Sequence, residues 1–536
     1  MAALSTRMHR RTFLGTTALG ALALALPGQG WAADPKPGGI VTVVAWPPPS
    51  YLTSAITTAG PETNLGAKFF DGLVDYDFGM VMRPALAESW EVSEDGLRIT
   101  FNLRQGVKWH DGAPFTAKDV AFTFMEILKV HHGRGRVTFE PVTAVETPDD
   151  HTAVLVLSRP APAILKSLDA VESPMMPAHL YQGTDIMQNP HNTKPVGTGP
   201  FKLVEYTVGE SIVMERNPDY WDTGKPYLDR VVFRYVSDSA TRTAMLETGE
   251  ADLVSFSMIP PLDVLRLQAD PGFAVTQKGY ETILSMAFID FNLRGPILSN
   301  PKVRQAIAHA MDMNWLLENV WFGFGYAATG PLHQEQADFY TAEGVPTYAP
   351  DLKKAEELLD EAGYPRGNGG LRFDLTIDPL PWGDEPLRAS EYMREQFRQI
   401  GINLTIRTAD MAGFVKRIYT ARDFDMSIVV GTSGPDPTIG VHRFFVSSNI
   451  KEGVAFSNGS GYANPEVDQI LEAARLEMDL DKRKQLYADF QRIVMTDLPS
   501  LPMIATNRSS VSKADVHDHT VGAIGSFGSL AHAWRG

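Results

Sequence analysis

The chain has 536 residues, 44% of them hydrophobic and 21% charged, which is the composition of a globular protein with room for two or three domains. Its 48 basic and 64 acidic residues give a formal net charge of −16, which argues against a nucleic-acid-binding protein. The absence of cysteine excludes disulfides, thiol catalysis, cysteine-based metal sites and a lipidated N-terminal cysteine.

The first 32 residues have the pattern of an export signal. Four residues resemble the twin-arginine export motif, and they are Arg10, Arg11, Phe13 and Leu14. The apolar run over residues 14–26 is shorter than the roughly 20 residues that a membrane-spanning helix needs. Small residues near Ala32 suit cleavage there, and no run of 18 apolar residues follows. We therefore expect a mature protein that is free in a periplasm, which implies a Gram-negative source.

The first part of the mature chain carries signals for two strands and two helices. The apolar run Gly39–Ala45 predicts a buried strand that leads into Trp46 and three prolines. Asn64–Leu73 has the pattern of a helix. Apolar residues alternate with polar ones over Leu97–Leu103, which predicts a strand with one buried and one solvated face. Thr116 can cap a helix that begins at the next residue.

The middle of the chain is uneven in its signals. Up to about Asn192 few patterns predict an element. Pro195–Trp221 then predicts a Gly/Pro turn, a hairpin and a tight turn at Asn217 and Pro218.

Beyond Phe288 the patterns of helices alternate with those of strands. Asn300 is a good N-cap with Pro301 in the first turn of a helix. Further helices are predicted over residues 351–363, 387–400 and 480–495, and strands over residues 371–377 and 402–406. This alternation indicates an α/β domain.

Several segments together resemble one known family. Pro84–Val120 (PALAESWEVSEDGLRITFNLRQGVKWHDGAPFTAKDV) closely resembles the signature segment of the peptide/opine/nickel solute-binding proteins, which serve ABC importers. Pro195–Trp221, Phe291–Asp312 (FNLRGPILSNPKVRQAIAHAMD) and Ala355–Tyr364 (AEELLDEAGY) are similar to further segments of that family. The resemblance covers most of the chain from about Gly38 onward.

The resemblance implies an α/β fold of the periplasmic-binding-protein type (type II, large). It has two lobes joined by two crossing strands and an extra subdomain inserted in the first lobe. Lobe I would comprise residues 37–81, 198–287 and 503–536, the inserted subdomain residues 82–197, and lobe II residues 288–502. The resemblance also implies a monomer that closes its lobes on a solute without a cofactor and then docks on an ABC permease.

Four residues near the ends of predicted strands are candidate ligand contacts. Trp46 follows the first strand, and Trp382 follows the strand predicted over residues 371–377. Asn292 and Arg294 follow a strand that ends at Ile289. The alternatives are that the tryptophans are ordinary core or surface residues and that Asn292 only braces the hinge.

The segment Val429–Phe445 departs from the family pattern. Peptide binders of the family usually have Trp-x-x-Asp in this loop, and the aspartate pairs with the α-ammonium of the peptide, because a desolvated ammonium needs a counterion. Aligned on Asp436 and Pro437, the tryptophan position is Val430 and the aspartate position is Ser433. The loop still offers hydroxyls and backbone N–H groups at Thr432, Ser433 and Gly434. A short peptide and a non-peptide solute, such as an opine, a glycoside or a small organic acid, both remain open.

Motifs of enzymes are absent from the sequence. There is no G-x-S-x-G nucleophile elbow and no H-E-x-x-H zinc motif. A hydrolase would need a positioned nucleophile and base. We therefore expect no catalytic residue and no metal site.

Overall fold

The computed structural model of the chain describes residues 34–536, of which residues 36–536 form one compact unit. The export signal predicted at Arg10, Arg11, Phe13 and Leu14 lies outside the described residues. Among residues 34–536, no helix is long and apolar enough to cross a membrane.

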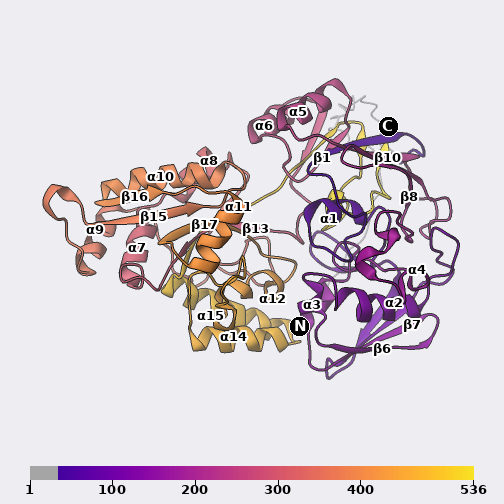
Figure 1. Cartoon of the computed structure of the whole chain (residues 1–536), viewed down its shortest axis with the longest axis horizontal. Coiled ribbons are helices and arrows are strands. Elements are labelled where there is room, and N and C mark those ends of the chain that lie inside the picture. Colours follow the sequence, from indigo (N-terminus) through magenta and orange to yellow (C-terminus); the bar gives the residue numbers. More distant parts are fainter. Residues whose placement is uncertain (1–33) are drawn as a thin grey trace, which may run out of the picture. The chain divides into compact units, whose positions relative to one another are not determined.

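A seven-stranded sheet is built from three separate parts of the chain (Figure 1). Its central strand β1 (Ile40–Ala45) confirms the first predicted strand and runs parallel to β10 (Arg230–Tyr235) and β11 (Leu253–Val254). The hairpin predicted after Pro195 is also present in this sheet as two antiparallel strands. The other strands of the sheet are β8 (Phe201–Thr207), β9 (Ser211–Arg216), β12 (Phe273–Thr276) and β19 (Ser510–Lys513). The helices α5 (Ser239–Thr248) and α6 (Pro261–Gln268) connect its strands.

A four-stranded antiparallel sheet lies in the segment predicted as the inserted subdomain. Its strands, in spatial order, are β4 (Ala87–Val92), β5 (Arg98–Leu103), β7 (Thr152–Leu157) and β6 (Val142–Asp149). In β5 the side chains of Ile99, Phe101 and Leu103 are buried while Arg98 and Asn102 are exposed, so the predicted alternation is confirmed. The capping prediction is confirmed too, because the backbone N–H of Thr116 donates to Asp119 at 2.9 Å at the start of α2 (Ala117–Phe122).

A six-stranded sheet with helices around it forms the second α/β part of the molecule. Its strands, in spatial order, are β14 (Gly325–Ala327), β18 (Ser500–Thr506), β13 (Ser285–Phe291), β17 (Met426–Thr432), β15 (Phe373–Pro379) and β16 (Ile402–Ile406). Its longer helices are α7 (Pro301–His309), α8 (Met313–Asn319), α9 (Leu352–Glu361), α10 (Glu385–Gln399), α14 (Pro465–Leu476) and α15 (Leu480–Asp497). The predicted N-cap is confirmed, since Asn300 accepts from the Lys302 N–H at 3.0 Å. The strand predicted over residues 371–377 begins and ends two residues later.

The helix predicted over Asn64–Leu73 is wrong in position. The structure has α1 at Gly60–Gly66, with a proline in its first turn. The helix does not continue because the carbonyls of Lys68 and Phe69 accept from the N–H groups of Phe201 and Gly199 instead, at 3.1 and 2.8 Å. A contact with a distant part of the chain therefore overrides the local helical pattern.

Two segments carry the chain between the seven-stranded and the six-stranded sheets. Residues 277–284 lead from β12 to β13, and residues 507–509 lead from β18 to β19. These strands pair within each sheet, β12 with β19 and β13 with β18. The two-lobed α/β fold with two crossing strands is thus confirmed. The predicted boundaries at 287/288 and 502/503 fall inside β13 and β18, a few residues within the six-stranded sheet.

The remaining strands and α-helices are short. They are β2 (Val74–Tyr76), β3 (Met82–Pro84), β20 (Val516–His517), β21 (Trp534–Arg535), α3 (Gly135–Thr138), α4 (Ala178–Tyr181), α11 (Met411–Val415), α12 (Pro437–Gly440) and α13 (His442–Phe445).

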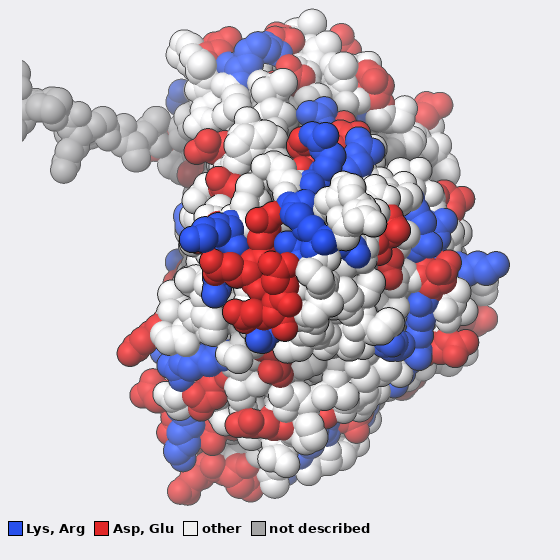
Figure 2. Space-filling model, turned by 90° about the vertical axis from the view of Figure 1, so that its left-hand side faces the viewer, with Lys and Arg blue, Asp and Glu red and all other residues white. Residues whose placement is uncertain are grey.

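Acidic and basic side chains are intermixed on one end of the molecule. Figure 2 shows the face at the left-hand side of Figure 1, where red and blue groups lie next to one another. On α9, Glu361 pairs with Lys302 at 3.0 Å, and Glu357 lies 3.9 Å from Lys353. Such exposed pairs contribute little stability. On this face one contiguous group of acidic side chains is bordered by basic ones (Figure 2).

Candidate functional site

Four strands of the six-stranded sheet, β15, β16, β17 and β18, end at one edge, and the candidate loops follow β15 and β17. β17 is parallel to β15, and β17 and β18 are both antiparallel to β13, so β15, β17 and β18 run in the same direction. In register, Ser285 lies opposite Thr432 on one side and Thr506 on the other. Ligands of α/β sheets bind beyond the carboxyl ends of the strands. This edge is therefore the natural place for a site.

The loop after β17 is held firmly at this edge. The Ser433 N–H donates to the Leu284 carbonyl at 2.6 Å, and the Gly434 carbonyl accepts from the Gln336 side-chain amide at 3.1 Å. Gly440 on α12 packs so closely that a Cβ there would lie 2.1 Å from the Ser433 carbonyl oxygen. These contacts hold the loop in place, with Thr432 half-buried and Ser433 and Gly434 buried.

A buried ion pair supports the far side of this loop. Arg483 on α15 contacts both carboxylate oxygens of Asp436, at 2.6 and 2.7 Å, and both side chains are buried. Burial by itself would raise the pKa of Asp436, but the Arg483 guanidinium holds that pKa below its ordinary value. Asp436 is therefore occupied by Arg483 and does not replace the missing acid at position 433.

A small apolar pocket lies behind the same loop. Its cavity volume is about 20 Å³, and it is lined by Met286, Phe288, Gly431, Val441 and Phe444 among others, beside Thr432 and Ser433. A Cβ at Gly431 would lie 2.9 Å from the ring of Phe444, so the glycine is needed for this packing. A cavity of this size admits a group of about the size of one water molecule.

Trp382 stands beyond the same edge. The Leu380 N–H donates to the Ile428 carbonyl at 3.0 Å, which ties the end of β15 to β17. Two residues later, the Trp382 side chain is 62% exposed. The structure thus brings Trp382 to the edge that carries the Thr432–Gly434 loop.

Trp46 occupies the corresponding place on the seven-stranded sheet. It follows β1, whose carboxyl end shares an edge with those of β10 and β11, and its side chain is 40% exposed. β19 is antiparallel to β11, so it begins at this edge. The crossing segment 507–509 therefore joins the carboxyl edges of the two sheets.

Two residues at this junction were missed by the sequence analysis. Phe256 follows β11, and Arg508 lies in the crossing segment with its guanidinium carbon 4.8 Å from the centre of the Phe256 ring. Neither residue belongs to a motif or a periodic pattern. Only the strand register brings them to the site.

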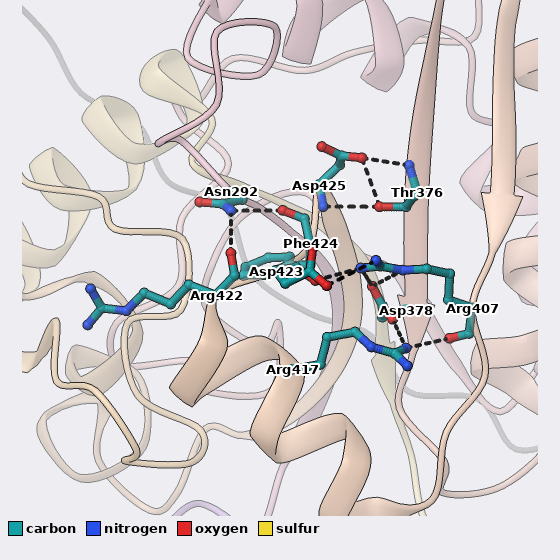
Figure 3. A network of polar contacts seen from close by, with 9 residues as sticks. All are labelled: Asn292, Thr376, Asp378, Arg407, Arg417, Arg422, Asp423, Phe424 and Asp425. Atoms are coloured by element: carbon teal, nitrogen blue, oxygen red, sulfur yellow. Dashed lines mark hydrogen bonds and ion pairs between the residues drawn. The ribbon is translucent and has the colours of Figure 1, made fainter.

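Asn292 and Arg294 lie at the opposite edge of the six-stranded sheet, because β13 runs against its neighbours. Figure 3 shows the Asn292 amide pointing at backbone carbonyls, and it donates to Phe424 at 2.8 Å and to Arg422 at 3.2 Å. Arg294 donates to the Asn292 side chain at 3.1 Å and to the Gly459 carbonyl at 2.9 Å. The structure therefore does not bring these two residues together with Ser433, and their polar groups brace the turn before β17.

The same view shows a second brace between β15 and β16. Asp378, which is buried, accepts from Arg407 at 2.7 Å and from Arg417 at 2.5 Å (Figure 3). Asp425 accepts from the hydroxyl and the backbone N–H of Thr376, both at 2.8 Å. These contacts tie the carboxyl end of β15 to the residue after β16, and the middle of β15 to the residue before β17. Within residues 34–536 no three His, Asp or Glu side chains are grouped so as to hold a metal ion.

Comparison with known proteins gives relatives of this chain in sequence and in structure. A family model described as bacterial extracellular solute-binding proteins, family 5 middle, matches residues 81–452. The heme-binding protein A of Haemophilus influenzae is 31% identical over 483 residues, which cover 85% of each chain. The crystal structure of DppA from Helicobacter pylori with the peptide STSA is similar with a TM-score of 0.75 at 26% identity, covering 93% of this chain and 98% of that one. The structure of AgaA from A. tumefaciens R10 with agropinic acid is similar with a TM-score of 0.73 at 25% identity, covering 93% and 99%.

Proposed function

This chain belongs to family 5 of the bacterial extracellular solute-binding proteins, and we propose that it is the periplasmic solute-binding component of an ABC importer. In this proposal it captures a short peptide or a peptide-like solute by closing its lobes, without covalent chemistry. The closed form then delivers the solute to a membrane permease. The protein acts as a monomer, catalyses no reaction and leaves the cytoplasm by the twin-arginine route.

One observation carries the proposal. The carboxyl edges of the two sheets meet at the crossing segments 277–284 and 507–509, and an exposed tryptophan stands at each edge, Trp46 and Trp382. Two lobes joined by two short segments are suited to hinge closure around a bound molecule. Aromatic side chains on both lobes would supply the apolar walls that a buried solute needs.

The proposed contacts are Trp46, Trp382 and the loop Thr432–Gly434. The loop would supply the hydroxyls of Thr432 and Ser433 and the N–H of Gly434 to the solute, since the Ser433 N–H already donates to the Leu284 carbonyl. We assign Asn292 and Arg294 to bracing, because the polar groups of Asn292 already have partners in the protein.

The proposed lobes follow the sheets. Lobe I would contain the seven-stranded sheet, with residues 82–197 as its inserted subdomain, and lobe II would contain the six-stranded sheet. The strands support boundaries within the crossing segments rather than at 287/288 and 502/503.

A non-peptide solute is the second candidate, and the residue at position 433 favours it. Ser433 offers no charge where peptide binders would place a partner for the α-ammonium, and Asp436 is already paired with Arg483. An opine, a glycoside or a small organic acid would need no such partner.

Small-angle scattering tests the proposed closure. The purified protein is measured alone and with two mixtures, a tryptic hydrolysate of casein and a small-molecule extract of bacterial cells. We expect the radius of gyration to decrease with at least one mixture and to recover after dialysis. An unchanged radius of gyration with both mixtures would contradict the proposed function.

A further inference from the structure

Arg508 is a cation without a partner at the junction of the two sheets. Its Nε atom is buried and has no hydrogen-bond partner among the described residues. Within residues 34–536 no carboxylate lies within ion-pair distance of its guanidinium. Leaving a buried charged donor unpaired is costly, so such a group needs an explanation. Arg508 follows β18 by two residues, at the edge of the six-stranded sheet that also carries the loop after β17.

The guanidinium is also held in place. It stacks on the ring of Phe256. The backbone of Phe256 is itself held in place, because its N–H donates to the Tyr280 hydroxyl at 2.7 Å. The Tyr280 hydroxyl in turn contacts the Ser510 hydroxyl at 2.6 Å, just after the crossing segment. An arginine stacked on an aromatic face presents its fork of N–H groups in a fixed orientation.

The strand register places Arg508 near the loop that follows β17. Thr506 and Thr432 flank Ser285 in neighbouring strands, so their backbones are about 10 Å apart, which is two inter-strand spacings. Arg508 lies two residues beyond Thr506, and Ser433 lies one residue beyond Thr432. A small solute can therefore reach both groups at once.

Charges of both signs lie around this place, because Glu281 is buried in the crossing segment 277–284 with one carboxylate oxygen unpaired, and Glu335 accepts from the Asn507 side chain at 3.3 Å. Glu385 attracts Arg508 from the start of α10, but it forms no ion pair with it, and burial lowers the pKa of Arg508. Arg443, on α13 behind the loop, donates its Nε–H to the Gly440 carbonyl at 3.1 Å and pairs with no carboxylate among the described residues. Of these two guanidiniums, Arg508 is the one that lies in a crossing segment between the two sheets.

We propose that Arg508 binds a carboxylate of the solute, so that the protein is selective for carboxylic acids. This inference rests on the proposed function and specifies the chemical class of its solute. Guanidinium and carboxylate match in geometry and form two parallel hydrogen bonds. On closure the guanidinium loses bound water, and the ion pair with the carboxylate replaces the hydrogen bonds to that water.

The test compares acids with their own esters. The casein hydrolysate and the cell extract are each divided, and one half is methyl-esterified, which removes the carboxylate charge and leaves the rest of each molecule intact. The protein is incubated with each of the four mixtures, separated from free molecules by gel filtration and denatured, and the retained molecules are identified by mass spectrometry. Arg508→Gln, Arg508→Lys and the exposed control Arg398→Gln are treated in the same way.

We expect the unaltered protein to retain acids roughly 10- to 100-fold better than their esters, the range for a hydrogen-bonded charge. Arg508→Gln should lose this preference, Arg508→Lys should keep part of it, and Arg398→Gln should keep all of it. The preference is a ratio within one protein sample, so a partly unfolded variant does not imitate its loss. Equal retention of acids and esters by the unaltered protein, or an unchanged preference in Arg508→Gln, would overturn the inference. If the unaltered protein retains nothing from any mixture, the proposed function itself fails and the inference falls with it.

Discussion

The pair of Asp436 and Arg483 shows how single residues hold the site loop. Asp436 follows Ser433 by three positions, caps α12 through the Thr438 N–H at 2.9 Å, and is bound on both oxygens by Arg483. A buried pair of this kind adds little net stability, but removing one partner leaves an uncompensated charge.

Replacing the cation of this pair should therefore be severe. We expect Arg483→Met to lower the free energy of unfolding by roughly 3–5 kcal/mol, measured by urea denaturation. The control Arg398→Met removes an exposed cation that pairs with Glu395 at 2.6 Å, and it should cost no more than about 1 kcal/mol. Similar losses in the two variants would contradict this description of the buried pair.

Asp290 makes the stability of the protein depend on pH. It lies buried in β13, and burial raises its pKa to about 8, although Arg294 partly opposes the shift. Since the folded state then binds a proton that the unfolded state releases near pH 4, the free energy of unfolding falls as the pH rises from about 4 to about 8.

Asp290→Asn should remove this slope, because asparagine keeps the shape and cannot ionise. We expect the variant to lose less stability than the unaltered protein between pH 5 and pH 8, by on the order of a few kcal/mol. Thermal and urea unfolding at several pH values measure the difference. Asp150→Asn, at a side chain that is 62% exposed, is the control and should leave the slope unchanged. A slope in Asp290→Asn equal to that of the control would show that Asp290 does not titrate in this range.

At the scale of elements, the loops that follow β1 and β15 carry the proposed aromatic walls. Trp46→Ala and Trp382→Ala should each weaken binding of a retained solute about 5- to 30-fold, the effect of losing 1–2 kcal/mol of contact. Isothermal titration with a solute identified from the protein measures this. Trp315→Ala is the matched control. Trp315 is also partly exposed, but it lies on a different surface, formed by helices of the six-stranded sheet, where its ring stacks on that of Tyr392 with 4.4 Å between the ring centres. Unchanged affinity in both Trp46→Ala and Trp382→Ala would remove the stacking assignment.

Elements with local signals could be predicted from the sequence. β5 was found because its alternation reflects one buried face, and α7 because Asn300 and Pro301 start it. β16 at Ile402–Ile406 was also found, since Gly401 separates it from the preceding helix.

Elements that depend on contacts with distant parts of the chain could not be predicted from the sequence. β6 (Val142–Asp149) has one buried residue, contains Pro148 and lies at the edge of its sheet, so it lacks the pattern of a strand. α1 was misplaced because the carbonyls of Lys68 and Phe69 bond to a segment about 130 residues later. For the proposed site, Trp46 and Trp382 could be named because each follows a predicted strand, and Thr432–Gly434 because their loop resembles a loop of the family. Arg508 was not, because it becomes a candidate only when register and burial are known.

At the scale of the whole molecule, two sheets are joined by two crossing segments at their carboxyl edges. The segments are short, and they are anchored on the lobe I side by Tyr280, whose hydroxyl accepts from the Phe256 N–H and contacts Ser510. Because each segment continues directly into a strand at both ends, the lobes can rotate about them without disturbing either sheet. This arrangement would bring the proposed binding site and the proposed hinge to the same place.

Native mass spectrometry of the freshly purified protein tests the central claim most directly. The mass of the intact protein is compared with its mass after denaturation, and any released small molecule is identified by fragmentation. The account predicts a single-chain species that carries one small solute and releases it on unfolding, with a carboxylate in that solute. A protein that carries no solute, and acquires none from the casein hydrolysate or the cell extract, would contradict the assignment to solute capture.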